Sequence, residues 1–194
     1  MNVYDFDKTI YDGDSSMDFY RFCLRSDLRL MRFWPKQLWG LIGYQASGRA
    51  STRYKSLFLA YLRGVRDLPD VVARFWDAHR HKLKGWYLAQ KRADDVIISA
   101  SPVFLLRPIC AELGVSLIAT EVDEKSGALR RRNCRGNEKP LLFREKYPDA
   151  VVDEFYSDSN SDVSMARLAA RAYFVCGDRV EVWEGLSGTQ GGEK

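Results

Sequence analysis

Two aspartates near the start of the chain are the residues whose type and spacing most directly suggest chemistry. Asp5 and Asp7 follow a short apolar run, and Thr9 adds a hydroxyl group two residues later. A carboxylate pair this close either raises the pKa of one member through repulsion or holds a cation between its oxygens. An acidic turn after a strand is the ordinary alternative, because Asp is common in turns. The residues downstream therefore decide between a reactive site and a turn.

Further polar groups follow at predicted strand ends and at a predicted helix start. They are Ser101, which closes an apolar run, Lys139, which begins a helical segment, and Asp158 with Asp162, which follow another apolar run. In open α/β sheets the ligand site lies beyond the carboxyl ends of the strands, so we expect these side chains to meet there. Carboxylates suit a hard cation such as Mg²⁺, while hydroxyl and ammonium groups suit phosphate oxygens. The set fits phosphoryl transfer.

Short apolar runs rich in β-branched residues alternate with helical patterns in this chain. Strands are predicted at residues 2–6, 95–101, 115–122, 151–156 and 172–176, with a last one ending at residue 183. Helices are predicted at residues 103–113, closed by Gly114, and at 139–147 and 163–171, and residues 128–134 are a candidate hairpin partner. Strand–helix alternation predicts a parallel sheet with right-handed crossovers. We therefore expect a Rossmann-like, three-layer α/β/α core.

A basic, helical segment interrupts this alternation. Helical runs are predicted from residue 16, at 28–42 with a break near Pro35, at 54–62, and from about 68 to 91. Residues 20–92 hold 16 Lys and Arg against 4 Asp and Glu, a charge of +12, whereas the remainder carries −8. The expected organisation is a core at residues 1–15 and 92–183, a helical cap at 16–91, and a disordered tail at 184–194.

The composition favours a cytoplasmic, globular protein. At 46% apolar and 29% charged residues, the chain can bury a core. No signal peptide is expected before Val3, and charged residues interrupt the apolar stretch at 28–44, so it cannot span a bilayer. The cysteines are scattered, which indicates reduced and mostly buried thiols.

The order of these motifs resembles the haloacid dehalogenase superfamily. The residues that carry the resemblance are Asp5-x-Asp7-x-Thr9, Ser101, Lys139 and Asp158-x-x-x-Asp162. The most similar subgroup is the phosphoserine phosphatase-like one, which has a helical cap between its first and second motifs. The resemblance covers about residues 1–183 and implies a Mg²⁺-dependent phosphomonoester hydrolase that works through an aspartyl-phosphate. It implies a small phosphorylated metabolite, similar to phosphoserine, as substrate.

The resemblance also implies a role for each motif residue. Asp5 would be the nucleophile and a metal ligand, and Asp7 would be the general acid and base, with its carbonyl on the metal. Asp158 would be the second metal carboxylate. Asp162 would bind the metal directly or through water and would hold Lys139. Lys139 and Ser101 would bind the phosphoryl oxygens, because a carboxylate attacks phosphate only when cations offset the repulsion.

Three positions depart from the family pattern. Lys8 stands where a Gly or another small residue is frequent, and Pro102 stands where phosphoserine phosphatases tend to have Gly, which leaves Val103 to supply a backbone N–H. Asp14 stands where those enzymes carry a Glu for the amino group of the substrate, but it could equally cap the first helix. The expected substrate-binding residues are Thr9, Asp14, Ser101, Val103 and Lys139.

The cap leaves alternatives open. In the ordinary interpretation, its aromatic residues form the core of a helical bundle and its basic residues form a solvated face. These basic residues could also focus an anionic substrate into the cleft. Contact of Arg29, Arg32, Lys36, Phe33, Trp34 and Trp39 with an anionic membrane is another option. It would favour a phosphatase of phospholipid headgroups, for which this superfamily has a precedent. A non-catalytic protein that binds nucleic acid or another anion, through the cap or through Arg130–Arg132, is the last alternative. The carboxylate set argues against it, and no nucleic-acid partner is expected.

Overall fold

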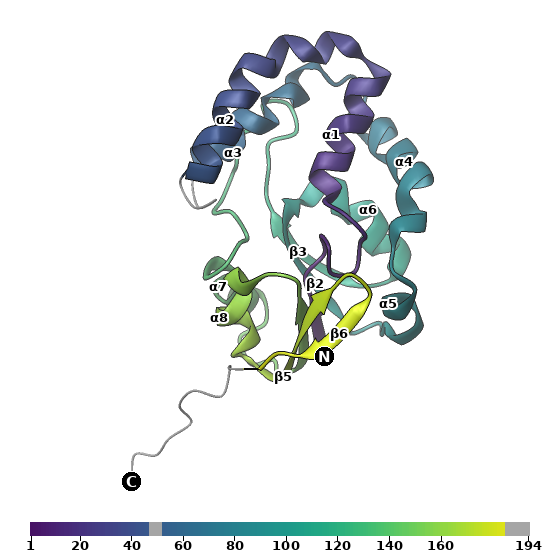
Figure 1. Cartoon of the computed structure of the whole chain (residues 1–194), viewed down its shortest axis with the longest axis vertical. Coiled ribbons are helices and arrows are strands. Elements are labelled where there is room, and N and C mark those ends of the chain that lie inside the picture. The colour runs from purple at the N-terminus through teal and green to yellow at the C-terminus, as the bar shows by residue number, and fades with distance from the viewer. Residues whose placement is uncertain (47–51, 185–194) are drawn as a thin grey trace.

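A computed structural model describes residues 1–46 and 52–184 of the chain (Figure 1). Its centre is a six-stranded sheet in the order β3-β2-β1-β4-β5-β6. The strands are β1 (Asn2–Tyr4), β2 (Val96–Pro102), β3 (Ser116–Thr120), β4 (Val152–Ser157), β5 (Ala169–Cys176) and β6 (Arg179–Val182). Neighbouring strands are parallel except β6, which is antiparallel to β5. The predicted α/β fold with a mostly parallel sheet is confirmed.

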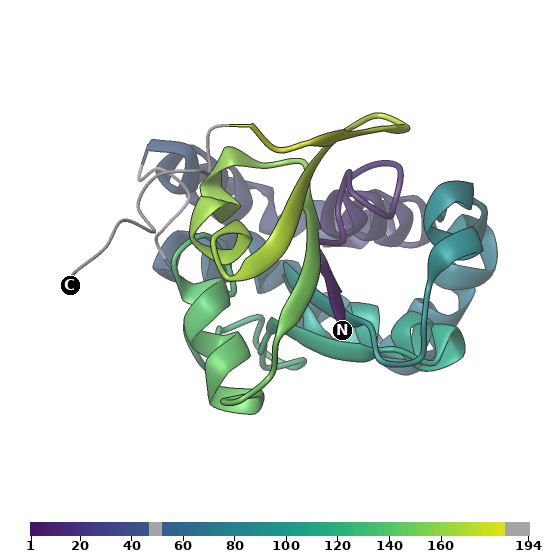
Figure 2. The same cartoon turned by 90° about the horizontal axis from the view of Figure 1, so that it is seen from below.

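Helices cover both faces of this sheet. They are α6 (Val103–Leu113), α7 (Glu138–Lys146), the 3₁₀ turn η4 (Asn160–Asp162) and α8 (Val163–Ala166). Because successive strand residues point to opposite faces, Tyr4 packs in one hydrophobic cluster with α6, and Val3 packs in a second cluster with α7 and α8. Figure 2 shows the green helices α7 and α8 on one side of the sheet and teal helices on the other. The core therefore has three layers.

A helical insertion lies between β1 and β2, which are neighbours in the sheet (Figure 1). Its elements are α1 (Ser15–Ser26), η1 (Leu28–Phe33), α2 (Trp34–Ala46), α3 (Thr52–Phe58), η2 (Leu59–Gly64), α4 (Leu68–His79), η3 (Arg80–Lys82) and α5 (Gly85–Gln90). The elements from α1 to α4 form the cap. The sequence therefore predicted correctly that helices interrupt the sheet at this point.

The α2 and α3 helices pack closely because small residues lie between them. A Cβ atom on Gly40 would lie 2.8 Å from the backbone nitrogen of Phe58 and 2.8 Å from the carbonyl oxygen of Tyr54. The buried Gln37 accepts a hydrogen bond from the hydroxyl group of Tyr20, at 2.7 Å, which joins α2 to α1. These contacts fix the inner side of α2.

Three predicted elements differ from the structure. The single helix expected from about 68 to 91 is divided into α4, η3 and α5, because Leu83 forms an antiparallel bridge with Tyr11, and Lys84 donates its backbone N–H to Ile10. The hairpin partner expected at 128–134 is present only at its start, where Val122 and Leu129 form an antiparallel bridge and Arg130 donates its backbone N–H to Glu121. The helix expected at 163–171 ends at Ala166, and β5 begins at Ala169. The break at residues 80–84 comes from contacts with a segment that is distant in the sequence.

All four cysteines are free thiols, and three of them are buried. No helix in the described residues is long and apolar enough to cross a membrane. The tail predicted at 184–194 lies, apart from Glu184, outside the described residues.

Candidate active site

Asp5 lies at the carboxyl end of the central strand β1. Its backbone N–H still donates to the carbonyl of Tyr156 in β4, at 2.9 Å, which fixes the position of the residue. Its side chain is mostly buried, and one carboxylate oxygen lies 2.8 Å from Nζ of Lys139. Burial raises the pKa of Asp5 to about 7, Lys139 opposes that rise, and the negative charge of Asp162 adds to it. Asp5 is thus a carboxylate at the sheet edge with one oxygen held by a cation.

Lys139 bridges two carboxylates at the start of α7. Its Nζ donates to Oδ2 of Asp162 at 2.6 Å in addition to its contact with Asp5, and its side chain is 2% exposed. Burial alone would lower the pKa of Lys139, but the two carboxylates outweigh it and raise the pKa above its usual range. Ser157 also donates to Oδ2 of Asp162, at 2.8 Å. Lys139 therefore keeps its positive charge and is held rigidly beside Asp5.

Asp7 is surrounded by hydrogen-bond donors from the second strand and from the start of the cap. Ser101 donates its hydroxyl at 2.5 Å, and Ser15 donates its backbone N–H at 2.7 Å. Burial and the nearby charge of Asp14 raise the pKa of Asp7 to about 6, although both donors oppose the rise. A carboxyl group with a pKa close to neutrality can both give and take a proton.

The end of β2 brings Ser101 out of the regular ladder. The register between β2 and β3 shifts between Ser99 and Pro102, and the backbone N–H of Ser101 donates to the hydroxyl of Ser99 at 3.0 Å. The hydroxyl of Ser101 also lies 3.1 Å from that of Ser15 and 2.8 Å from that of Ser16. Hydroxyl groups from the core and from the cap therefore meet beside Asp7.

The loop between the two aspartates and the cap has a strained residue. Lys8 has a φ of 59°, in the left-handed region that favours glycine, which gives a physical reason for a small residue at this position. Lys84 donates from Nζ to the carbonyl of Lys8 at 2.8 Å. The buried Thr9 accepts from the backbone N–H of Asp158 at 3.1 Å. The loop is thereby tied to the strand end that carries Asp158.

The remaining predicted residues have different positions. Asp14 caps α1 by accepting from the backbone N–H of Met17 at 2.9 Å, and its side chain also lines the cavity beside Asp7. Val103, expected to supply a backbone N–H to the substrate, lines a separate cavity together with Phe104, and its N–H remains a prediction. Thr9 is fully buried and holds Asp158 rather than lining the cavity.

The predicted catalytic and metal-binding side chains line one cavity of about 400 Å³ between the core and the cap. The core contributes Asp5, Asp7, Ser101, Lys139, Asp158 and Asp162 to its wall. The cap contributes apolar and polar side chains from α2 and α3. The cavity thus combines carboxylates, a fixed cation and hydroxyl groups, which can bind a phosphorylated molecule and transfer protons to it.

A family model for haloacid dehalogenase-like hydrolases matches residues 3–167. The chain belongs to this family.

Known proteins are similar to this chain in sequence or in fold. CicA of Caulobacter vibrioides is 32% identical over 108 residues, which cover 52% of this chain and 44% of CicA. A crystal structure of a protein of unknown function from Bordetella pertussis Tohama I has a TM-score of 0.73 and 20% identity, and covers 89% of this chain and 87% of that chain. A phosphoserine phosphohydrolase-like protein from Francisella tularensis has a TM-score of 0.58 and 13% identity, and covers 89% of this chain and 86% of that one. The matched region spans less than half of CicA, and the structural similarities show the fold alone.

Asp5 and Asp158 are the best candidates in the hydrolase for a metal ion. Both line the same cavity, and in the described part of the chain no side chain donates a hydrogen bond to the carboxylate of Asp158. Burial raises the pKa of Asp158, although Lys8 and Lys139 oppose the rise. No three His, Cys, Asp or Glu side chains among the described residues form a metal site by themselves. Two carboxylates, with backbone carbonyl groups, water and substrate oxygens, fit Mg²⁺, which commonly keeps several non-protein ligands.

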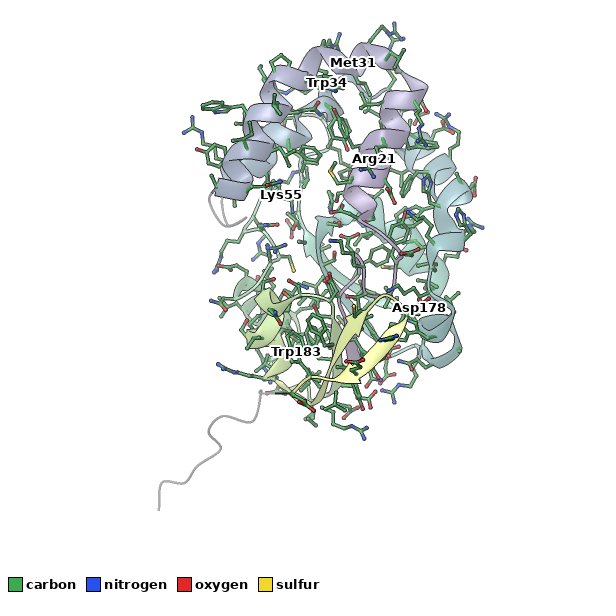
Figure 3. The ribbon with its side chains drawn as sticks, in the orientation of Figure 1. Arg21, Met31, Trp34, Lys55, Asp178 and Trp183 are labelled. Carbon is green, nitrogen blue, oxygen red and sulfur yellow. The ribbon has the colours of Figure 1, made fainter. Side chains whose placement is uncertain are left out.

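The sequence analysis missed two basic side chains of the hydrolase that line this cavity. Lys55 of α3 reaches from the cap to the core, where Nζ donates to the carbonyl of Ala100 at 2.5 Å and to Oδ1 of Asn133 at 2.6 Å (Figure 3). Burial lowers the pKa of Lys55 to about 8, although the charge of Asp7, among others, opposes this. Arg135 lines the same wall. Lys55 lies in a predicted cap helix, and Arg135 follows the candidate hairpin partner at 128–134 and not a predicted parallel strand, so the convergence of strand ends did not indicate either residue.

Proposed function

We propose that this hydrolase is a Mg²⁺-dependent phosphomonoesterase that works through a phosphorylated Asp5. The observation that carries the proposal is the cavity in which Asp5 and Asp158 lie with Lys139, Ser101 and Asp7, whose pKa is raised to about 6. Members of this family generally use Mg²⁺. When bound by Asp5 and Asp158, the ion would supply positive charge that offsets repulsion between carboxylate and phosphate.

The chain's own residues account for the other steps. The carboxylate oxygen of Asp5 that does not contact Lys139 attacks phosphorus, and the bond to the leaving oxygen breaks. Lys139 and Ser101 stabilise negative charge on the phosphoryl oxygens. Protonated Asp7 gives its proton to the leaving oxygen and then takes a proton from the water that hydrolyses the aspartyl-phosphate, which releases phosphate, frees the carboxylate of Asp5 and returns Asp7 to its protonated form.

The substrate class that fits best is a small phosphorylated metabolite. The cavity of about 400 Å³ has room for a small phosphomonoester, and Lys55 and Arg135 add positive charge for a second anionic or polar group. One carboxylate oxygen of Asp14, Oδ1, accepts the capping bond from Met17, which leaves the other for a substrate amino group. The lining therefore favours an acidic phosphorylated metabolite, with phosphoserine-like molecules as one group to test.

The first experiment measures phosphate release from p-nitrophenyl phosphate with Mg²⁺ and with EDTA. Asp5→Asn should lower Mg²⁺-dependent turnover by at least about a thousandfold, since it removes the nucleophile. Asp12→Asn is the matched control, because Asp12 is exposed in the same loop and should leave turnover unchanged. Equal turnover of wild type and Asp5→Asn would exclude this mechanism. If the wild type does not accept the aryl ester, acidic phosphorylated metabolites are tested with the same pair of variants.

A further inference from the structure

The outer face of η1 and α2 exposes a concentrated group of large apolar side chains. More than half of the large apolar side chains that are exposed in the described chain lie between Leu28 and Ile42. Trp39 is 67% exposed and Trp34 is 50% exposed. We call this group the apolar cap face, and its members are Leu28, Met31, Trp34, Leu38, Trp39 and Ile42. Such a patch on a soluble domain usually marks an interaction surface.

The helix geometry explains how one side of α2 is apolar and exposed, although Trp34 at its start also makes a side-chain hydrogen bond with Tyr20 of α1. Trp34, Leu38 and Ile42 recur every four residues and therefore lie on one side of the helix. The opposite side is occupied, because Gln37 is buried and Gly40 packs against α3. Figure 3 shows Met31 and Trp34 at the end of the cap farthest from the sheet. The apolar cap face is thus available to a partner without unfolding the cap.

The surroundings of this face are strongly basic. No Asp or Glu occurs between Leu28 and Arg66, a stretch that carries eight Lys and Arg residues. Arg32 and Lys36 are exposed between the apolar residues, and no acidic side chain of the described chain pairs with either of them. Arg29 is paired with Asp27 at 3.0 Å. A partner for this face must therefore offer both apolar volume and negative charge.

An anionic lipid bilayer satisfies both requirements. Aromatic rings lie favourably at the headgroup level, aliphatic side chains enter the acyl boundary, and basic residues contact lipid phosphates. A second copy of the chain would bring the same basic stretch against this one, which is repulsive. Nucleic acid would match the charge but would leave Leu38 and Ile42 without an apolar environment.

We propose that the apolar cap face docks on the surface of an anionic phospholipid bilayer, with α2 lying along the interface. Leu41 and Gln45 on the same helix line the catalytic cavity, so docking brings that cavity close to the lipid headgroups. The inference rests on the surface and not on the phosphatase proposal, because lipid binding requires no turnover.

Co-sedimentation of the full chain with vesicles tests the proposal. Vesicles of phosphatidylglycerol and phosphatidylcholine should bind the wild type, and vesicles of phosphatidylcholine alone should bind it at least tenfold more weakly. Leu38→Gln with Trp39→Gln should weaken binding to the anionic vesicles at least tenfold, because it removes apolar insertion without a change of charge. Arg32→Gln with Lys36→Gln should weaken it roughly fivefold per residue.

Matched controls lie on the core, away from the cap. Val151→Gln with Val182→Gln removes two apolar side chains of similar exposure, and Arg167→Gln with Arg179→Gln removes two exposed charges. Both pairs should bind anionic vesicles within about twofold of the wild type, and circular dichroism should show that all variants are folded.

Three outcomes would overturn the proposal. One is that the wild type does not bind anionic vesicles. Another is that the cap variants and the core variants lose binding equally, which would indicate non-specific attraction. The third is that the double variant with Leu38→Gln and Trp39→Gln binds vesicles as the wild type does, and that its only effect is the dissociation of a dimer or a change in RNA binding.

Discussion

At the scale of single residues, the site depends on a buried cation between buried carboxylates. Lys139 is almost inaccessible and contacts Asp5 and Asp162 directly. Desolvating three charges is costly, and mutual attraction repays that cost only with close contacts such as these. Removal of the lysine would leave two carboxylates buried without their cation.

Lys139→Met should therefore lower the free energy of unfolding in EDTA by about 3–5 kcal/mol at pH 7.5. Asp5 already has a pKa raised to about 7, and loss of the lysine raises it further above its value in the unfolded chain. The loss of stability in Lys139→Met is thus present at pH values above the pKa that Asp5 has in the unfolded chain. It becomes smaller as the pH falls and the carboxyl group of Asp5 is protonated. Urea unfolding of both proteins at pH 5 and pH 7.5 measures the effect. A difference from wild type that is the same at both pH values would contradict this account.

Lys55 gives the cavity a charge that changes within the working pH range. Its pKa is lowered to about 8, whereas Lys139 stays protonated well above that pH. A base loses its proton as the pH rises through its pKa, so the cap loses one cation between pH 7 and pH 9. The other groups that influence this titration are Cys134, Asp7, Arg135 and Asp14.

Wild-type kcat/KM for an acidic phosphorylated substrate should therefore fall above pH 8, through a rising KM. Lys55→Met should lower kcat/KM about tenfold at pH 7, which corresponds to about 1.4 kcal/mol, and should abolish this alkaline limb. Lys125→Met, at an exposed position away from the cavity, should keep the wild-type profile. A Lys55→Met profile that retains the same limb would assign the titration to another group.

Sequence reasoning succeeded at residues that follow strands, and it failed at residues supplied by the cap. Asp5, Ser101 and Asp158 could be grouped because the carboxyl ends of parallel strands converge. Ser16 and Lys55 reach the site only through the docking of the cap on the core, which no local pattern encodes. Val103 was assigned to the substrate through its backbone N–H, and that assignment stays a prediction, because the cavity that Val103 lines elsewhere does not test the N–H.

At the scale of elements, the position of α2 depends on glycine contacts. In most helices Gly→Ala is stabilising by about 0.5–1 kcal/mol, because alanine loses less backbone entropy. At Gly40 the added Cβ atom would lie 2.8 Å from backbone atoms of α3, which cannot rotate away as a side chain does.

Gly40→Ala should therefore reverse the usual sign and lower the free energy of unfolding by about 1–3 kcal/mol, which lowers Tm by about 3–10 °C. Gly85→Ala is the control, since a Cβ atom there meets nothing within 4 Å. Differential scanning calorimetry of the three proteins measures both effects. An unchanged or higher Tm for Gly40→Ala would mean that α2 and α3 are not packed this closely.

Elements with strong local signals were predicted well, and those ended by distant contacts were not. Helix α6 runs from Val103 to Leu113 as predicted, because Gly114 adopts the left-handed conformation that closes it. The predicted helix across residues 80–84 is broken instead by backbone pairing of Leu83 and Lys84 with the loop after Asp7. That pairing joins the base of the cap to the catalytic loop.

At the scale of the whole molecule, a basic cap lies over an acidic sheet edge. The cap stretch at 20–92 carries +12 and the remainder −8, and the cavity lies between the two parts. Burial raises the pKa of Asp5 and that of Asp158, and Lys139 opposes the rise without cancelling it. Folding in the absence of metal therefore confines uncompensated carboxylates, and a bound cation should stabilise the entire protein.

Mg²⁺ at about a hundred times its Kd should raise the free energy of unfolding by about 2.7 kcal/mol, which raises Tm by about 5–10 °C.

The Asp158→Asn variant should differ from wild type in opposite directions in EDTA and in Mg²⁺. Because the folded-state pKa of Asp158 is raised, its charge costs stability at neutral pH without metal, so the variant should be at least as stable as wild type in EDTA. In Mg²⁺ it should be the less stable protein, because it has lost a ligand, whereas Asp12→Asn should follow wild type in both. Thermal unfolding with EDTA and with graded Mg²⁺ gives all four comparisons. If Asp158→Asn gained as much from Mg²⁺ as wild type does, the ion would have to bind elsewhere, and the charge at the sheet edge would need another explanation.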